Sequence, residues 1–203
     1  MKFSEVKPHE PRWIAPIVMD TLRRMASGHR VSKIANEVLS NPRFAIWGGS
    51  SGEGAHHNYH GGLAEHTMEV AQLADANARL LRIDVNHQEL FLAALFHDVG
   101  KLWDYEYNEV SGKWQGTKHK RIIHHISRSG VEWIKAVEKT NSFREISDNV
   151  LHAILAHHGR REWGSPVAPL SKVAWLIHLA DQLSARMNDA DTNDIIKAGN
   201  GDK

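Results

Sequence analysis

The chain has no cysteine among its 203 residues, which excludes disulfide bonds, thiolate zinc sites, iron–sulfur clusters and cysteine nucleophiles. Any bound metal must therefore use nitrogen and oxygen ligands. Long apolar runs are also missing: no stretch approaches the roughly 18 apolar residues of a membrane span, and the N-terminal segment has no signal-peptide core. These features predict a cytoplasmic protein with no membrane partner.

Excess charge of one sign is missing as well. Lys and Arg total 25 and Asp and Glu total 24, so the formal net charge is only +1. Such a balance gives no general electrostatic reason to expect strong binding of long nucleic acids. Histidine, in contrast, is abundant, with 15 residues. Several of these histidines fall on apolar faces of predicted helices.

The hydrophobic pattern follows a period of 3.6 residues, with no convincing alternation of the strand type, and predicts an all-α fold. We expect helices at residues 11–26, 30–40, 63–81, 88–97, 122–139, 144–158 and 170–187, and a long polar, aromatic-rich loop at 104–120. The domain assignment is an N-terminal helical extension (1–29), one helical domain (30–187) and a polar C-terminal tail (188–203). A homo-oligomer is compatible with this pattern, but no feature specifies one.

The pair His97-Asp98 is the most informative feature, because it directly follows the wholly apolar run LFLAALF. An imidazole and a carboxylate at the end of a buried helix must be paired, hydrogen-bonded or metal-bound, since an uncompensated buried charge costs several kcal/mol. Taken alone, such a pair is more often a satisfied polar group than a metal ligand. Other helices add further candidates.

His66 takes the missing place in the apolar stripe of Leu63, Val70 and Leu73, so it is predicted to point inward. Equivalent inward or helix-end positions hold further histidines and an aspartate: His124, His125, His157, His158 and Asp181. Convergence of these side chains predicts a metal site in the core of the bundle. Imidazoles and carboxylates without thiolates suit zinc, manganese, iron, nickel or cobalt.

The ordered pattern of His66, His97-Asp98, His125, His158 and Asp181 resembles the HD-domain metal-dependent phosphohydrolase superfamily. The segments HHNYHGGLAEHT, AALFHDVGKL, HHGRREWGSPVAP and LIHLADQLSARM look like the HD domain of the YhaM-like 3′–5′ exoribonucleases. This resemblance spans about residues 30–187 and implies an all-helical HD-domain bundle.

Two departures from the family pattern limit the comparison. YhaM-like exoribonucleases place an OB-type nucleic-acid-binding domain before the HD domain, and only about 30 residues precede the matching region here. We therefore expect the RNA-holding module to be missing. A family segment that usually reads Gly-His is here His124-His125, which leaves its ligand open; His125 is favoured and His124 is the alternate.

The resemblance implies two divalent ions. His66, His97, Asp98 and Asp181 would surround one, and Asp98 would bridge to a second ion held by His125 and His158, with His157 as the alternate to His158. Two such ions activate a water and clamp a phosphoryl group. Catalytic roles are expected for Asp98 and Lys101, and substrate contacts for Lys101, His57, His60, Arg160 and Arg161.

The resulting hypothesis is a metal-dependent phosphohydrolase that cleaves phosphoester bonds of nucleotides or short oligonucleotides with a metal-activated hydroxide. Three alternatives remain: a 3′–5′ exonuclease on single-stranded RNA or DNA, an HD-type di-iron oxygenase with the same ligand types, and a non-catalytic ligand-sensing domain.

Overall fold

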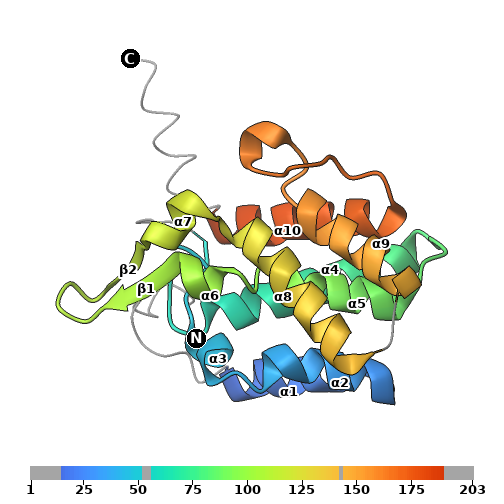
Figure 1. The fold of residues 1–203 in the computed structure, drawn as a ribbon, viewed down its shortest axis with the longest axis horizontal. Helices are drawn as coiled ribbons and strands as arrows, with labels where there is room; N and C mark the ends of the chain where they lie inside the picture. Colours follow the sequence, from blue (N-terminus) through green and yellow to red (C-terminus); the bar gives the residue numbers. More distant parts are fainter. Residues whose placement is uncertain (1–14, 52–55, 142–143, 190–203) are drawn as a thin grey trace.

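The computed structural model describes residues 15–51, 56–141 and 144–189, which form a bundle of helices with one small hairpin (Figure 1). The elements are α1 (Ala15–Met25), α2 (His29–Leu39), α3 (Pro42–Ile46), α4 (Gly62–Leu80), α5 (His87–Phe96), α6 (Lys101–Asp104), β1 (Tyr105–Asn108), β2 (Lys113–Gly116), α7 (Lys118–Ile122), α8 (His125–Thr140), α9 (Arg144–Ala156), a 3₁₀ turn (Arg161–Trp163) and α10 (Lys172–Asp189). The predicted helical fold class is confirmed.

Helix α5 is the central element of the bundle. Every residue from Leu90 to Phe96 is buried, and the helix packs against α2, α4, α8, α9 and α10. It begins at an Asn86 cap whose side chain accepts the backbone N–H groups of Gln88 and Glu89. Because α5 ends inside the bundle, His97 and Asp98 follow it as buried residues rather than as a solvated helix end.

The helices around α5 share a single hydrophobic core. Helices α4 and α10 pack side by side, and α9 packs on α10, α5 and α8. The N-terminal helix α1 packs on α4 and α2 through Val18, Met19 and Leu22, so it contributes to the same core. Residues 11–14 of the predicted first helix lie outside the described residues, as does almost all of the predicted tail.

The predicted loop at residues 104–120 is wrong in its main part, because this segment folds into an antiparallel hairpin. Tyr105 pairs with Gly116 and Tyr107 with Trp114, and Gly112 adopts a φ of +64° in the turn. Four-residue strands carry too few alternations to be distinguished from a polar loop by periodicity. The hairpin packs against α6, at the end of the bundle that also contains α7 (Figure 1).

The predicted helix at 122–139 corresponds to α8, which begins three residues later, and the short helix α7 precedes it. Helix α7 ends at Ile122 and α8 begins at His125, and the intervening His124 has φ +69° and ψ 146°. This backbone conformation favours glycine, so the chain changes direction at a strained residue. Among the described residues, every helix is too short or too polar to traverse a lipid bilayer.

Candidate metal centre

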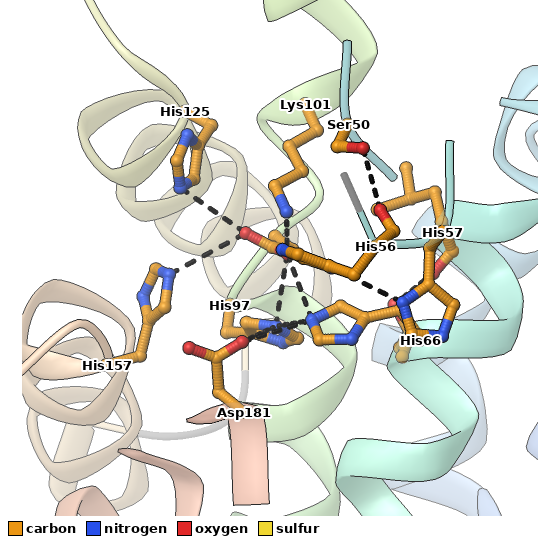
Figure 2. A network of polar contacts seen from close by, with 12 residues as sticks. Ser50, His56, His57, His66, His97, Lys101, His125, His157 and Asp181 are labelled. Carbon is orange, nitrogen blue, oxygen red and sulfur yellow. Dashed lines mark hydrogen bonds and ion pairs between the residues drawn. The ribbon is translucent and has the colours of Figure 1, made fainter. Parts of the chain in front are cut away.

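The carboxylate of Asp98 lies at the meeting point of four histidine side chains from separate parts of the bundle. Its Oδ2 atom is 3.3 Å from Nε2 of His66 and 3.3 Å from Nε2 of His97. Its Oδ1 atom is 3.4 Å from Nε2 of His125 and 3.6 Å from Nε2 of His157. Figure 2 shows these imidazoles turned toward a shared centre. The two oxygens of one carboxylate thus face two different pairs of histidines.

Asp181 on α10 completes the first group. Its Oδ1 atom lies 3.1 Å from Nε2 of His66 and 3.9 Å from Nε2 of His97. The ligand atoms of His66, His97, Asp98 and Asp181 all lie within 4.8 Å of one another, and all four residues are buried. The second group consists of His125, His157 and His158, whose ligand atoms meet the same 4.8 Å limit.

Both members of the His157-His158 pair therefore belong to the second group. His157 is the more buried of the two, and its Nε2 atom faces Asp98, whereas His158 is half-buried beside it with a ring-centroid separation of 4.4 Å. Of the other pair, His125 is buried against Asp98 and begins α8, while His124 precedes the helix and is half-buried.

Three of these imidazoles have their Nδ1 atom fixed by a backbone carbonyl. The pairs are His97 with Ala94 (2.7 Å), His157 with Ile154 (2.6 Å) and His158 with Trp163 (2.6 Å). A carbonyl oxygen can only accept, so Nδ1 carries the proton and Nε2 retains its lone pair. The local backbone therefore selects the tautomer that a metal ligand at Nε2 requires.

His66 receives the same orientation through side chains. The Ser184 hydroxyl donates to Oε2 of Glu69 at 2.7 Å, and it accepts from Nδ1 of His66 at 2.9 Å. Glu69 also accepts from Nε2 of His57 at 3.2 Å. His57, which the sequence suggested as a substrate contact, is thus placed behind His66 with 1% of its surface exposed.

His125 is oriented by Asp104, a buried carboxylate that the sequence reasoning missed. Asp104 accepts from the backbone N–H of His125 at 2.9 Å and from its Nδ1 at 3.2 Å. It also accepts from Nδ1 of His119 at 2.7 Å, and Arg128 donates to Nε2 of the same ring at 3.2 Å. Arg128 can only donate, so His119 accepts at Nε2 and donates from Nδ1 to Asp104. The carboxylate of Asp104 accepts from both rings, so Nδ1 of His125 carries the proton and its Nε2 faces the centre unprotonated.

Charges inside the centre are strongly coupled. The Nζ atom of Lys101 lies 2.6 Å from Oδ2 of Asp98. Burial opposes ionisation of both groups, but their mutual attraction outweighs it: the pKa of Lys101 rises to about 12, and the pKa of Asp98 falls well below its usual range. Burial alone would lower the pKa of His66, but hydrogen bonds to Asp181 and Asp98 raise it.

The second group has the opposite electrostatic character. Burial lowers the pKa of His125 to about 4, against the smaller effect of Asp104. Burial, followed by the neighbouring His157 and His125, lowers the pKa of His158 to about 2. Both rings are therefore neutral at pH 7, which is the form that binds a metal.

The donor atoms of the centre fit a divalent cation. Three buried atoms of the centre have no hydrogen bond: Oδ1 of Asp98 and the Nε2 atoms of His125 and His157. Oδ2 of Asp98 has no hydrogen bond of good geometry either, but it forms the ion pair with Lys101. Buried polar atoms are nearly always satisfied, and an unpaired one costs about 1–3 kcal/mol. Unpaired lone pairs from imidazoles and a carboxylate, all directed at one space, form a ligand set of the nitrogen and oxygen type.

The remaining candidates lie around this centre rather than in it. The ring of His60 packs on Tyr107 at 4.5 Å, beside the hairpin. Arg160 is exposed, with its guanidinium 5.0 Å from the ring of Trp163, and Arg161 is exposed on the 3₁₀ turn. His56, which the sequence reasoning did not select, groups with His57 and His66.

An all-helical bundle with buried histidine and aspartate groups defines the class of protein. The family model of the HD domain matches residues 63–186, a segment that contains both ligand groups. The chain belongs to the HD domain family. The resemblance inferred from the sequence motifs is thereby confirmed.

The chain is also similar to curated proteins named 3′-5′ exoribonuclease YhaM. It is 36% identical to the protein of Bacillus subtilis (strain 168) over 138 residues, which cover 67% of this chain and 42% of that protein. It is 34% identical to the protein of Bacillus velezensis over 161 residues, covering 78% of this chain and 47% of the relative. The chain thus spans less than half the length of these relatives. No solved structure matches it.

Proposed function

We propose that this chain is a metal-dependent phosphohydrolase that cleaves phosphoester bonds of nucleotides or short oligonucleotides. The observation that carries the proposal is the position of Asp98, whose two oxygens face two separate sets of imidazole Nε2 atoms at 3.3–3.6 Å. A carboxylate in that position can serve two cations at once, as in two-metal phosphoryl-transfer sites.

The residues that would hold the metals follow from these contacts. His66, His97, Asp98 and Asp181 would hold one cation, and His125, His157 and His158, with the other oxygen of Asp98, would hold a second. Divalent cations supply Lewis acidity toward phosphoryl oxygens and make a water acidic enough to act as a nucleophile near pH 7. Manganese, iron, nickel, cobalt and zinc all suit this ligand set.

Residues of the chain supply orientation and charge. The carbonyls of Ala94 and Ile154 and the carboxylate of Asp104 fix the ligand rings, so little reorganisation is needed when substrate binds. The ammonium of Lys101 is buried beside Asp98, where low solvent exposure strengthens its attraction for a phosphoryl oxygen. We assign Lys101 to phosphate contact and charge stabilisation.

Two observations bear on the size of the substrate: the net charge of the chain and the names of its curated relatives. A net charge of +1 gives weak sequence-independent affinity for long strands at physiological salt. The names of the curated relatives favour 3′–5′ exonuclease activity on RNA as a second candidate. The two candidates differ in the polarity and length dependence of cleavage.

Metal analysis and a substrate screen test the proposal. The protein is loaded separately with each of the five metals, its metal content is measured by mass spectrometry, and nucleoside mono-, di- and triphosphates and 2- to 20-residue oligonucleotides are assayed by chromatography. We expect two ions per chain and faster turnover of the short substrates. His87→Ala is the matched control, because His87 is an exposed histidine that pairs with Asp75 outside the centre.

Each other outcome points to a different function. Faster, stepwise shortening of the long RNA from its 3′ end would favour the exonuclease. Oxygen uptake by the iron-loaded protein without phosphoester cleavage would favour the oxygenase. Nucleotide binding without turnover under any metal would favour a ligand-sensing domain.

A further inference from the structure

A cavity of about 440 Å³ lies beside α7, outside the candidate metal centre. Its volume falls within the roughly 300–1,000 Å³ typical of small-molecule sites. The lining residues are Ser51, Gly116, Thr117, Lys120, Arg121 and His124. They supply two cations, two hydroxyls and an imidazole, and no carboxylate, which is a lining suited to an anion.

The cavity adjoins the candidate metal centre through His124. The ring of His124 lies 4.2 Å from the ring of His125 and 6.2 Å from the ring of His158, measured between centroids. His125 in turn contacts Asp98. One imidazole thus separates the cavity from the proposed site of cleavage. Two neighbouring phosphates of one substrate could therefore occupy the cavity and the metal centre at the same time.

The two basic side chains that line the cavity differ in their contacts. Lys120 reaches across the cavity, with Nζ 3.4 Å from the Ser51 hydroxyl and 4.7 Å from the ring centre of Tyr105. Arg121 is exposed, and within the described part of the chain its side chain has no ion pair or hydrogen bond. A guanidinium without a carboxylate partner is available for the oxygens of a phosphate, which it can bind in bidentate fashion.

The backbone of His124 is a second, independent observation. Its φ of +69° and ψ of 146° lie in a region that glycine adopts readily and that costs a residue with a side chain free energy. Strained residues of this kind are held in place by the surrounding structure and are concentrated at active sites and ligand-binding sites. An imidazole at the boundary between cavity and metal centre is placed to contact both neighbouring phosphates of a substrate.

We propose that this cavity binds the backbone phosphate next to the phosphoester that is cleaved, and so makes the chain prefer oligonucleotides over mononucleotides. The proposal rests on the proposed function, because it identifies the substrate class of the same centre. Lys120 and Arg121 provide the charge, and His124 provides a ring contact or hydrogen bond between the two phosphates.

Charge removal from the ligand and from the protein tests this subsite. Binding of fluorescein-labelled trithymidylate to chelator-treated protein is measured by anisotropy, with the natural ligand and with ligands that carry a neutral methylphosphonate at either linkage. For the wild type we expect neutralisation of one of the two linkages to weaken binding about tenfold, the scale of one charge-assisted hydrogen bond. Arg121→Ala should lose most of this difference between the natural and the neutral ligand, since only Lys120 then remains to pair with the charged linkage.

Lys118 offers the matched control, since it is an exposed lysine on the same helix α7 but does not line the cavity. Lys118→Ala should keep the tenfold sensitivity of the wild type. Equal sensitivity to neutralisation in wild type, Arg121→Ala and Lys118→Ala would overturn the proposal, as would the absence of measurable binding by the wild type at low salt. Arg121 is exposed, so its replacement does not endanger folding.

His124 is tested with two substitutions. His124→Ala and His124→Gly should both weaken trithymidylate binding, because both remove the imidazole. His124→Gly should also melt about 2–4 °C above His124→Ala, because glycine relieves the backbone strain. Wild-type affinity in both variants would exclude His124 from the subsite.

The outcomes separate this proposal from the proposed function. If metal-loaded wild-type protein cleaves thymidine 5′-(p-nitrophenyl phosphate), which has one phosphodiester, but Arg121→Ala shows an unchanged KM for trithymidylate, only the subsite is refuted. If linkage-specific binding is found and no substrate is cleaved under any metal, the subsite stands and the hydrolase proposal fails.

Discussion

The ammonium of Lys101 lies 2.6 Å from Oδ2 of Asp98, in the buried space where the Nε2 atoms of His66 and His97 also meet. The two residues stand three positions apart, so the turn between α5 and α6 brings them together. A permanent positive charge therefore lies within reach of the proposed ligands. Its distance from Asp98 makes Lys101 the residue best placed to meet a phosphoryl group at the centre.

Lys101→Ala should lower kcat about 10²-fold, the usual scale for one preorganised electrostatic contact, while metal content stays unchanged. Lys101→Arg should recover part of the rate, because a planar guanidinium does not replace a compact ammonium in a buried space. Steady-state kinetics and metal analysis of the same preparations check both expectations. Full turnover in both variants would show that Lys101 has no catalytic role.

Asp98→Ala should remove most bound metal and abolish activity. The fold should also lose stability, by about 3–5 kcal/mol, because the buried ammonium of Lys101 is left without its partner. The double variant Asp98→Ala/Lys101→Met removes both charges and should regain stability without regaining metal. Thermal unfolding with parallel metal analysis separates the two effects, and normal metal content in Asp98→Ala would contradict the bridging role.

Much of the centre could be predicted from the sequence because its ligands lie on periodic helices or directly at their ends. The stripe of Leu63, Val70 and Leu73 places His66 inward, and the apolar run before His97 predicts burial of the ligand pair. Helical phase over several turns fixes direction well. It fixes direction poorly at helix ends: the sequence favoured His158 with His157 as the alternate, whereas in the structure Nε2 of His157 faces Asp98.

Features that depend on contacts between distant segments could not be predicted. Asp104 lies in a segment without periodicity, and its partners His119 and His125 follow it by 15 and 21 residues. The hairpin brings them together only after its short strands have paired. The clue in the sequence was a single acid between Trp103 and Tyr105, a place where an unpaired carboxylate would be costly.

The order of metal loss on replacing each histidine tests the ligand groups. His125→Ala should lose more metal than His124→Ala, because His125 alone of that pair contacts Asp98. His157→Ala should lose at least as much as His158→Ala, since Nε2 of His157 is 3.6 Å from Asp98 and has no hydrogen-bond partner. Metal stoichiometry of the four variants gives the ranking, and a reversed order within the first pair would show that the orientation of α8 is misassigned.

Asp104→Asn should weaken metal affinity about 10- to 100-fold, the usual effect of removing a partner that orients a ligand. An amide offers only one acceptor oxygen, whereas Asp104 accepts from both His119 and His125. The competition of the protein with a fluorescent chelator measures the affinity. Glu106→Gln is the matched control, because Glu106 lies two residues away on β1 and is exposed. Equal affinities in the two variants would refute the orienting role.

The stability of chelator-treated protein should fall as the pH falls from about 6.5 to 4, in part because of His125. Burial lowers the pKa of His125 to about 4 in the folded chain, against about 6.5 in the unfolded chain. Between these values the unfolded chain binds a proton that the folded chain does not, so His125 contributes a loss of up to about 1.4 kcal/mol per pH unit and none above pH 7. His66, whose pKa is raised, acts in the opposite direction.

Comparison with His125→Gln isolates the contribution of His125, since glutamine does not titrate. The unfolding free energy is measured by urea titration at pH 7, 6 and 5. Its slope against pH should be shallower in the variant, by the equivalent of nearly one bound proton. Parallel pH dependences in the two proteins would show that His125 is not held neutral by burial.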